Sequence, residues 1–189
     1  MAVMLSSETS TVIFDLNVQE VFTLDIAPES QEWKISAETW QKWFQTWLES
    51  LLNHLPPAPS YELSLRLTGD EEIQAFNAQY RQKNQPTDVL AFAALEVDVP
   101  NPLDTSEPLY LGDIVISLET AHRQAEQQSH TLTIELAWLA AHGLLHLLGW
   151  DHLDDETLEE MLGEQETLLQ NIHVYSNSCQ NTVQFEQNS

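Results

Sequence analysis

The segment His142–His152 carries three histidines in the pattern H-x-x-x-H-x-x-G-x-x-H. His142 and His146 are four residues apart, so a helix places both imidazoles on one face. Gly149 can take the left-handed conformation that ends a helix, after which the chain can return His152 toward the other two. Three neutral imidazoles that converge suit Zn²⁺ and leave its fourth position open for water. The spacing therefore predicts a catalytic zinc site with one ion per chain.

Two neighbouring kinds of zinc site are less compatible with these residues. A closed structural site needs a fourth protein ligand, and the single cysteine, Cys179, lies far downstream in a polar segment. Zinc proteases of the metzincin class share the histidine spacing but place a glutamate directly after the first histidine, where it acts as general base. Here that position is Gly143, which has no side chain to accept a proton. A peptidase would need a substitute base near the metal.

Two other blocks join the histidine segment in a recognisable order. N-A-Q-Y-R at Asn77–Arg81 is followed by P-T-D-V-L-A-F at Pro86–Phe92, and L-G-D-I-V-I-S occupies Leu111–Ser117. With His142–His152, these blocks resemble the YbeY family, the metal-dependent, single-strand-specific endoribonucleases of bacteria. The resemblance spans about residues 60–170.

Three positions depart from the family pattern. Trp150 stands where tyrosine is usual, Ala91 replaces a common serine, and Ala93 stands where a proline often follows the phenylalanine. These changes concern loop contacts and leave the histidine pattern intact.

The resemblance implies a zinc-dependent hydrolase, an endoribonuclease that acts in ribosome quality control and in rRNA processing, at the 3′ end of the small-subunit 16S rRNA in particular. A water or a ribose 2′-hydroxyl activated by zinc would attack the phosphodiester. The implied partners are single-stranded or ribosomal RNA and the ribosomal small subunit or its associated proteins. Two alternatives stay open: a zinc peptidase, and a non-enzymatic ribosome-assembly factor whose metal only holds the fold.

Besides the metal ligands His146 and His152, three residues are assigned roles. Arg81 is the catalytic candidate, because a planar guanidinium matches the oxygens of a phosphodiester and the family block supports it. Its alternative role is a structural cation at a helix end. His142 is assigned as both ligand and catalytic residue. Asp151 is a candidate to accept a hydrogen bond from the imidazole of a metal ligand and so orient its ring. Its alternative role is to cap a helix or form a turn.

The charge of the chain opposes an RNA substrate. Thirty acidic residues face six basic ones, for a net charge of −24. Such a field repels phosphate, and counterion release from Lys and Arg normally drives non-specific RNA binding. Arg81 and Lys83 lie beside the second family block, so we expect weak RNA binding by the chain alone, assisted by a ribosomal partner or Mg²⁺.

Composition also bounds the compartment and the organisation of the chain. One cysteine excludes a disulfide framework, and neither a signal peptide nor a membrane-spanning run is apparent, so a cytoplasmic protein is expected. We expect a frayed N-terminus over residues 1–10, a single metal-hydrolase domain over 11–171, and a polar, disordered tail over 172–189.

The hydrophobic periodicity predicts an α+β fold, in which a small mixed sheet of about four strands packs with several helices around a central buried helix that carries the histidines. An aromatic and leucine stripe after Ser36 marks a core helix, and Thr68–Glu71 has the pattern of a capping box. The predicted strands are 11–16, with a possible resumption at 21–24, then 61–67, 88–95 and 110–117; the later helices are 117–128, 131–148 and one that Asp154 caps.

Overall fold

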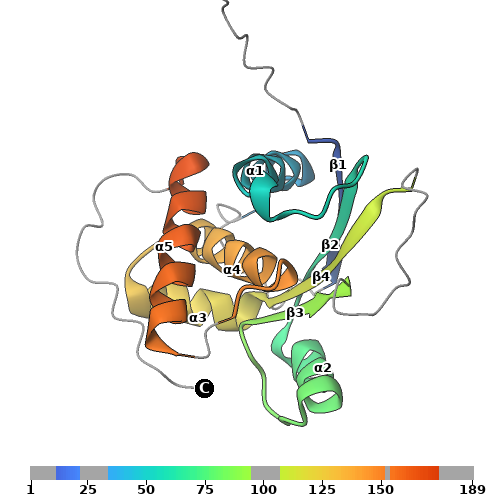
Figure 1. The fold of residues 1–189 in the computed structure, drawn as a ribbon. Helices are drawn as coiled ribbons and strands as arrows, with labels where there is room; N and C mark the ends of the chain where they lie inside the picture. The colour runs from blue at the N-terminus through green and yellow to red at the C-terminus, as the bar shows by residue number, and fades with distance from the viewer. Residues whose placement is uncertain (1–11, 22–33, 95–106, 152–153, 175–189) are drawn as a thin grey trace, which may run out of the picture.

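The computed structural model describes residues 12–21, 34–94, 107–151 and 154–174. No helix within these residues is long and apolar enough to cross a membrane. Figure 1 shows a sheet on one side of the molecule and helices gathered mainly on the other. The elements in chain order are β1 (Phe14–Val21), α1 (Ala37–Ser50), the 3-10 turn η2 (Leu52–His54), β2 (Tyr61–Thr68), α2 (Asp70–Arg81), β3 (Val89–Ala93), β4 (Leu109–Ser117), α3 (Leu118–Gln128), α4 (Leu132–Leu147) and α5 (Asp155–Asn171).

The four strands form one mixed sheet in the order β1-β2-β4-β3. β1, β2 and β4 run parallel, and β3 lies antiparallel to β4 at the edge. α4 lies in the middle of the molecule between the sheet and α5 (Figure 1), and twelve of its sixteen residues are buried. The predicted α+β class, the mixed four-stranded sheet and the central buried helix are confirmed.

Helices cover both faces of the sheet. On the larger face, α1, α3, α4 and α5 share one core with the strands, whereas on the other face α2 forms a small cluster of its own. That cluster consists of Ile73 from α2 with Leu90 and Val115 from β3 and β4. α2 and α4 therefore lie on opposite faces of the sheet, next to its β3 edge.

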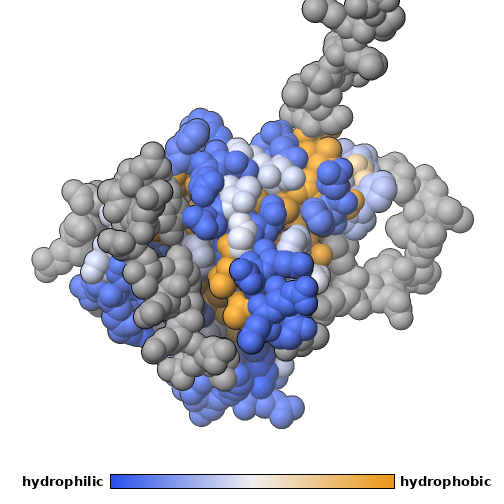
Figure 2. Space-filling model, turned by 60° about the vertical axis from the view of Figure 1, so that its left-hand side comes forward, coloured by the Kyte–Doolittle hydropathy of each residue, from blue (hydrophilic) through white to orange (hydrophobic). Residues whose placement is uncertain are grey.

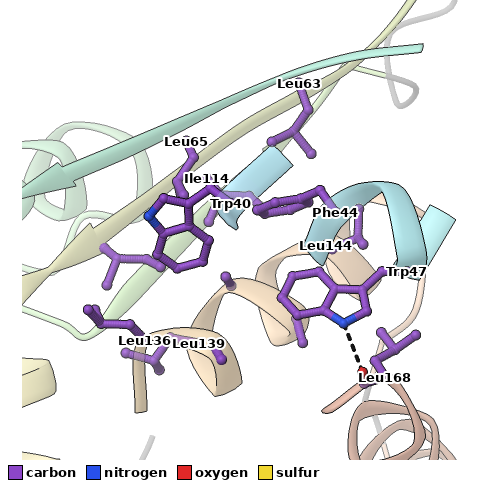
Figure 3. Close-up of a cluster of buried hydrophobic side chains, with 14 of the residues drawn as sticks. Trp40, Phe44, Trp47, Leu63, Leu65, Ile114, Leu136, Leu139, Leu144 and Leu168 are labelled. Atoms are coloured by element: carbon purple, nitrogen blue, oxygen red, sulfur yellow. Dashed lines mark hydrogen bonds between the residues drawn. The ribbon is translucent and has the colours of Figure 1, made fainter. Parts of the chain in front are cut away.

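The aromatic stripe of α1 fills the centre of the larger core (Figure 3). Ser36 is the N-cap, and its hydroxyl accepts a hydrogen bond from the backbone N–H of Thr39, as the sequence predicted. Trp47 donates its indole N–H to the carbonyl of Leu168 at 2.9 Å, which fastens α1 to α5. The fully buried members of the stripe are Trp40, Phe44, Trp47, Leu48 and Leu51, whereas Leu52 lies beyond the end of the helix and is 40% exposed.

Two local predictions were wrong. The predicted break between the strand segments 11–16 and 21–24 is absent: β1 runs without interruption from Phe14 to Val21, because parallel pairing with the whole of β2 carries the strand through polar residues. Residue 11 and residues 22–24 of this prediction lie outside the described residues. The expected capping box at Thr68–Glu71 does not form: the N-cap is Gly69, without a side-chain bond. Instead, the backbone N–H of Asp70 donates to the Glu119 carboxylate of α3 at 2.6 Å.

Asp70 joins the beginnings of α2 and α3. Its carboxylate accepts hydrogen bonds from Ser117 and Thr120 and pairs with Arg123 at 2.9 Å. Partial burial acts to raise the pKa of Asp70, but the hydrogen bonds from Ser117, Thr120 and Arg123 outweigh it and hold the pKa below its usual value. This link fixes the base of α2, at whose far end Arg81 lies.

Glutamines of α1 bond to the open side of β1. The Gln41 side chain accepts from the N–H of Leu16 at 3.0 Å and donates to the carbonyl of Phe14 at 2.7 Å. Gln45 donates in the same way to the carbonyl of Val12. At the alternate positions of the strand, the backbone N–H and C=O groups face β2 instead; the hydrogen bond from Tyr61 N–H to the Ile13 carbonyl is an example. α1 thus supplies partners to an edge strand that would otherwise lack them on this side.

The buried indole of Trp47 yields a stability prediction. Trp47→Phe should lower the free energy of unfolding by about 2 kcal/mol, because it leaves the Leu168 carbonyl without its donor and opens a small void. Trp43→Phe makes the same chemical change on the same helix at a half-buried site and should cost less than about 1 kcal/mol. Urea unfolding of both variants gives the comparison, and equal losses would contradict it.

Candidate metal centre

The helix that carries the first two histidines has well-defined ends. Thr131 is its N-cap and accepts from the N–H of Ile134 at 3.3 Å, while Leu148 is its C-cap. Beyond it, Gly149 N–H bonds to the His146 carbonyl and Trp150 N–H to the Leu145 carbonyl. These two bonds make a Schellman motif, in which Gly149 takes a φ of +86°. The predicted glycine stop after the second histidine is confirmed.

His142 and His146 point toward each other. Their Nε2 atoms are 3.1 Å apart, and the two rings meet edge to face with centroids 4.6 Å apart. Both residues are half-buried, within a stretch of α4 whose other residues are almost all buried. The i, i+4 spacing has therefore brought two nitrogen donors together at one point near the end of a core helix.

Gln165 of α5 supports the first histidine from behind. Its Oε1 lies 3.3 Å from His142 Nδ1, and its Nε2 donates to the Trp138 carbonyl at 2.9 Å. The Gln165 side chain is fully buried. Sequence reasoning missed this residue, although it had a signal: a glutamine stands on the apolar face of α5 between Met161 and Leu168.

The histidine pair fits a zinc ion. Two imidazole nitrogens, each about 2.0–2.1 Å from Zn²⁺ at the tetrahedral angle, lie about 3.3 Å apart. The observed separation of His142 and His146 Nε2, 3.1 Å, is close to this value. In the part of the chain that the structure describes, no group of three His, Cys, Asp or Glu side chains could hold a metal. The predicted third ligand, His152, lies outside the described residues.

The position that follows His142 has no room for a side chain. A Cβ built on Gly143 would lie 2.8 Å from Ile114 Cγ2, with two further Ile114 carbons within 3.3 Å. Ile114 is fully buried in β4, so it cannot move aside cheaply. The glutamate that metzincins carry here would therefore collide with the sheet, and helix and strand approach closely because the residue is glycine.

Arg81 lies apart from the histidines. It is the last residue of α2, exposed, on the opposite face of the sheet from α4. Among the described residues, no hydrogen bond or ion pair joins Arg81 to His142 or His146. The structure thus brings together two of the predicted site residues and places Arg81 on a separate element, with β3 between α2 and α4 (Figure 1).

The sequence is similar to a family of known proteins. The sequence model of the family described as "Endoribonuclease YbeY" matches residues 25–173. A Nostoc protein named Endoribonuclease YbeY is 58% identical over 181 residues, which cover 92% of this chain and 98% of that protein. The chain belongs to the YbeY family. A YbeY of Trichodesmium erythraeum is 64% identical over 132 residues, 69% of this chain and 72% of the relative, and one of Synechocystis is 49% identical over 168 residues, 88% and 94%.

A solved structure agrees with the fold. The solution structure of TM1509 from Thermotoga maritima aligns with a TM-score of 0.53 and covers 92% of this chain and all of that one. Its sequence is 21% identical to this chain, so the likeness concerns the fold alone.

Two polar residues of the YbeY blocks hold backbone in place. Asn77 is buried in α2 and donates to the carbonyl of Gln85 at 2.8 Å, which ties down the turn after Arg81. The Asp88 carboxylate accepts from the N–H of Val89 at 2.7 Å and from the Gln124 side chain at 3.0 Å. These contacts account for both residues without a part in chemistry.

A shallow pocket lies at the end of the family's histidine helix. It measures about 430 Å³ and is lined by residues of the turn after α4, of η2 and of α5: His54, Leu148, Gly149, Trp150, Asp151, Thr157 and Glu160. The rings of His54 and Trp150 are 5.4 Å apart across it. Asp151 is exposed in this wall, and its proposed ring partner, His152, is outside the described residues. The sequence did not predict the contact between His54 and Trp150, because only the tertiary fold brings η2 to the turn after α4.

The helix stop generates a prediction with a matched control. Gly149→Ala should lower the free energy of unfolding by about 1 kcal/mol, because alanine is strained at a φ of +86°. Gly163→Ala, within the regular helix α5, should raise it by about 0.5 kcal/mol, since its Cβ meets nothing within 4 Å. Thermal unfolding measures both, and a neutral Gly149→Ala would be inconsistent with the left-handed stop.

Proposed function

We propose that this chain is a zinc-dependent endoribonuclease that cleaves single-stranded RNA and matures the 3′ end of 16S rRNA on the ribosomal small subunit, in the cytoplasm. The observation that carries the proposal is the pair of His142 and His146 Nε2 atoms, 3.1 Å apart, in a chain of the YbeY family. The relatives' name supplies the endoribonuclease activity, and the histidine pair supplies a place for the metal.

We assign each site residue a separate role in binding the metal. His142, His146 and His152 would hold the metal through neutral ring nitrogens, and Asp151 would orient the ring of His152. A bound zinc ion lowers the pKa of water and polarises a phosphoryl oxygen. The closed contact between Gly143 and Ile114 leaves no acid beside the first ligand, so the proton of the attacking group leaves by another route. This absence disfavours the zinc peptidase alternative, which needs such an acid.

Arg81 is proposed to bind the phosphodiester. Within the described residues, neither Arg81 nor Lys83 forms an ion pair, so both charges can face phosphate. Arginine presents two parallel N–H donors that match two non-bridging oxygens. Because Arg81 and the histidines lie on opposite faces of the sheet, a bound RNA would pass the β3 edge to meet both. In contrast, three other cations do have acidic partners: Lys42 pairs with Glu38, Arg66 with Glu72 and Arg123 with Asp70.

The acidic surface sets a condition on RNA binding. The face drawn in Figure 2 is largely hydrophilic, and the net charge is −24. Long-range repulsion of phosphate follows, which a ribosomal protein or Mg²⁺ would have to offset. We therefore propose that the small subunit or proteins associated with it recruit the chain to RNA.

The metal can be tested by removal. A chelator should abolish cleavage of a single-stranded RNA, and Zn²⁺ should restore it. His142→Ala and His146→Ala should both lose cleavage and Zn²⁺ affinity, whereas His122→Ala, on the partly exposed surface of α3, should keep both. Zn²⁺ at about a hundred times its dissociation constant should also stabilise the fold by about 3 kcal/mol, read as a rise in melting temperature.

The same measurements separate the alternatives. RNA cleavage that persists without metal would refute the proposal. Hydrolysis of a casein-type peptide, in place of RNA, would indicate the peptidase. A chain that needs zinc to stay folded but cleaves neither substrate would indicate an assembly factor with a structural metal.

Arg81 provides an independent prediction. Arg81→Ala should lower kcat/KM for RNA about a hundredfold, because one donor to the developing charge is lost, while Zn²⁺ affinity and melting temperature stay unchanged. Arg81→Lys should recover only part of the loss, since a lysine cannot make the two-pronged contact. Lys83→Ala serves as the control for general attraction of phosphate and should reduce cleavage only a few-fold. Equal effects of the Arg81 and Lys83 variants would exclude a specific role for Arg81.

A further inference from the structure

We propose that Gln165 is a positioning residue for the metal: it fixes the tautomer and the orientation of His142, so that Nε2 is the nitrogen that faces the ion. This inference rests on the proposed metal at His142 and His146. It adds a residue from α5, outside the three sequence blocks that carry the family resemblance.

The direction of each hydrogen bond follows from one group that can only accept. The backbone carbonyl of Trp138 has no hydrogen, so the Gln165 atom 2.9 Å from it must be the amide nitrogen. The amide oxygen is then the atom that lies 3.3 Å from His142 Nδ1. An oxygen acceptor at that place favours the tautomer that carries its proton on Nδ1 and leaves Nε2 bare.

The bare nitrogen is the one that meets the second histidine. His142 Nε2 is 3.1 Å from His146 Nε2, on the far side of the ring from Gln165. With its proton on Nδ1, His142 offers a lone pair at this point, whereas the other tautomer would place a hydrogen there. Zinc binding needs the lone pair, so Gln165 prepares the ring before the metal arrives.

Burial makes the arrangement rigid. Gln165 is fully buried, and both ends of its amide have a partner. A rotated amide would place N–H donors against His142 Nδ1–H and a carbonyl against the Trp138 carbonyl, at a cost of about 1–3 kcal/mol for each unpaired group. The Trp138 carbonyl is one helical turn before His142, so the same helix that carries the ligand also holds its support.

Two substitutions isolate the contact with the ring. Gln165→Met keeps the length of the side chain but has no oxygen, whereas Gln165→Glu keeps an oxygen for Nδ1. Neither is an amide, so both change the bond to Trp138. A difference in metal affinity that separates them therefore reports on the bond to His142. Folding of the full chain is checked by circular dichroism.

The measurements are metal affinity and the tautomer itself. Competition with a chromophoric chelator, for Zn²⁺ and for Co²⁺, should show Gln165→Met weakened about 10–100-fold and Gln165→Glu within about threefold of wild type. Nitrogen-15 NMR of the metal-free wild type should show His142 protonated on Nδ1, and Gln165→Met should shift the ring toward the Nε2–H form.

Each outcome decides the inference. Wild-type affinity and an unchanged tautomer in Gln165→Met would overturn it while leaving the proposed zinc site intact. A wild-type chain that binds neither ion would overturn the proposed function as well. Should Gln165→Met fail to fold, the wild-type spectrum decides alone, because an Nε2–H ring at His142 contradicts the assignment.

Discussion

The structure depends on how α4 holds two half-buried imidazoles at the border of an apolar core. Twelve of the sixteen residues of α4 are buried, and the partly buried ring nitrogens of the two histidines need hydrogen-bond partners where water cannot reach them. The nitrogens of His142 are satisfied on one side by Gln165 and on the other by His146. α5 must lie against α4 to supply the first partner, and Gly143 must lie against Ile114 for the helix to approach the sheet. The packing that buries α4 is thus the same packing that sets the positions of the two histidines.

Features that depend on neighbouring residues in the chain could be predicted from the sequence. Ser36, Ser117 and Asp154 cap helices as expected, because a cap needs only a hydroxyl or carboxylate three residues before a free N–H. The facing histidines and the glycine stop followed from helical spacing for the same reason. Period-two alternation located β2, and a β-branched run located the central β4, since each is decided by which side chains can be buried.

Features that depend on distant partners escaped prediction. The first N–H of α2 is bonded by Glu119 from α3, so the local pattern at Thr68 did not decide the cap. The contact of Gln165 with His142 could not be predicted without knowing which turn of α5 packs against that histidine, although a polar residue on the apolar face of α5 was a signal. The role of Arg81 came from a resemblance and stays a prediction, because it lies on the other face of the sheet from the histidines.

The bonds that Gln41 and Gln45 make to β1 have a consequence for how molecules of this chain meet one another. An edge strand of a sheet has unpaired backbone N–H and C=O groups, which can pair with a strand of another molecule and lead to aggregation. Gln41 copies the hydrogen-bonding of a fifth strand with a single side chain, giving one acceptor and one donor to the same peptide segment. The bonds from Gln41 and Gln45 occupy the first part of this edge, from Val12 to Leu16, so a second copy of the chain could not pair with β1 there without displacing α1 side chains.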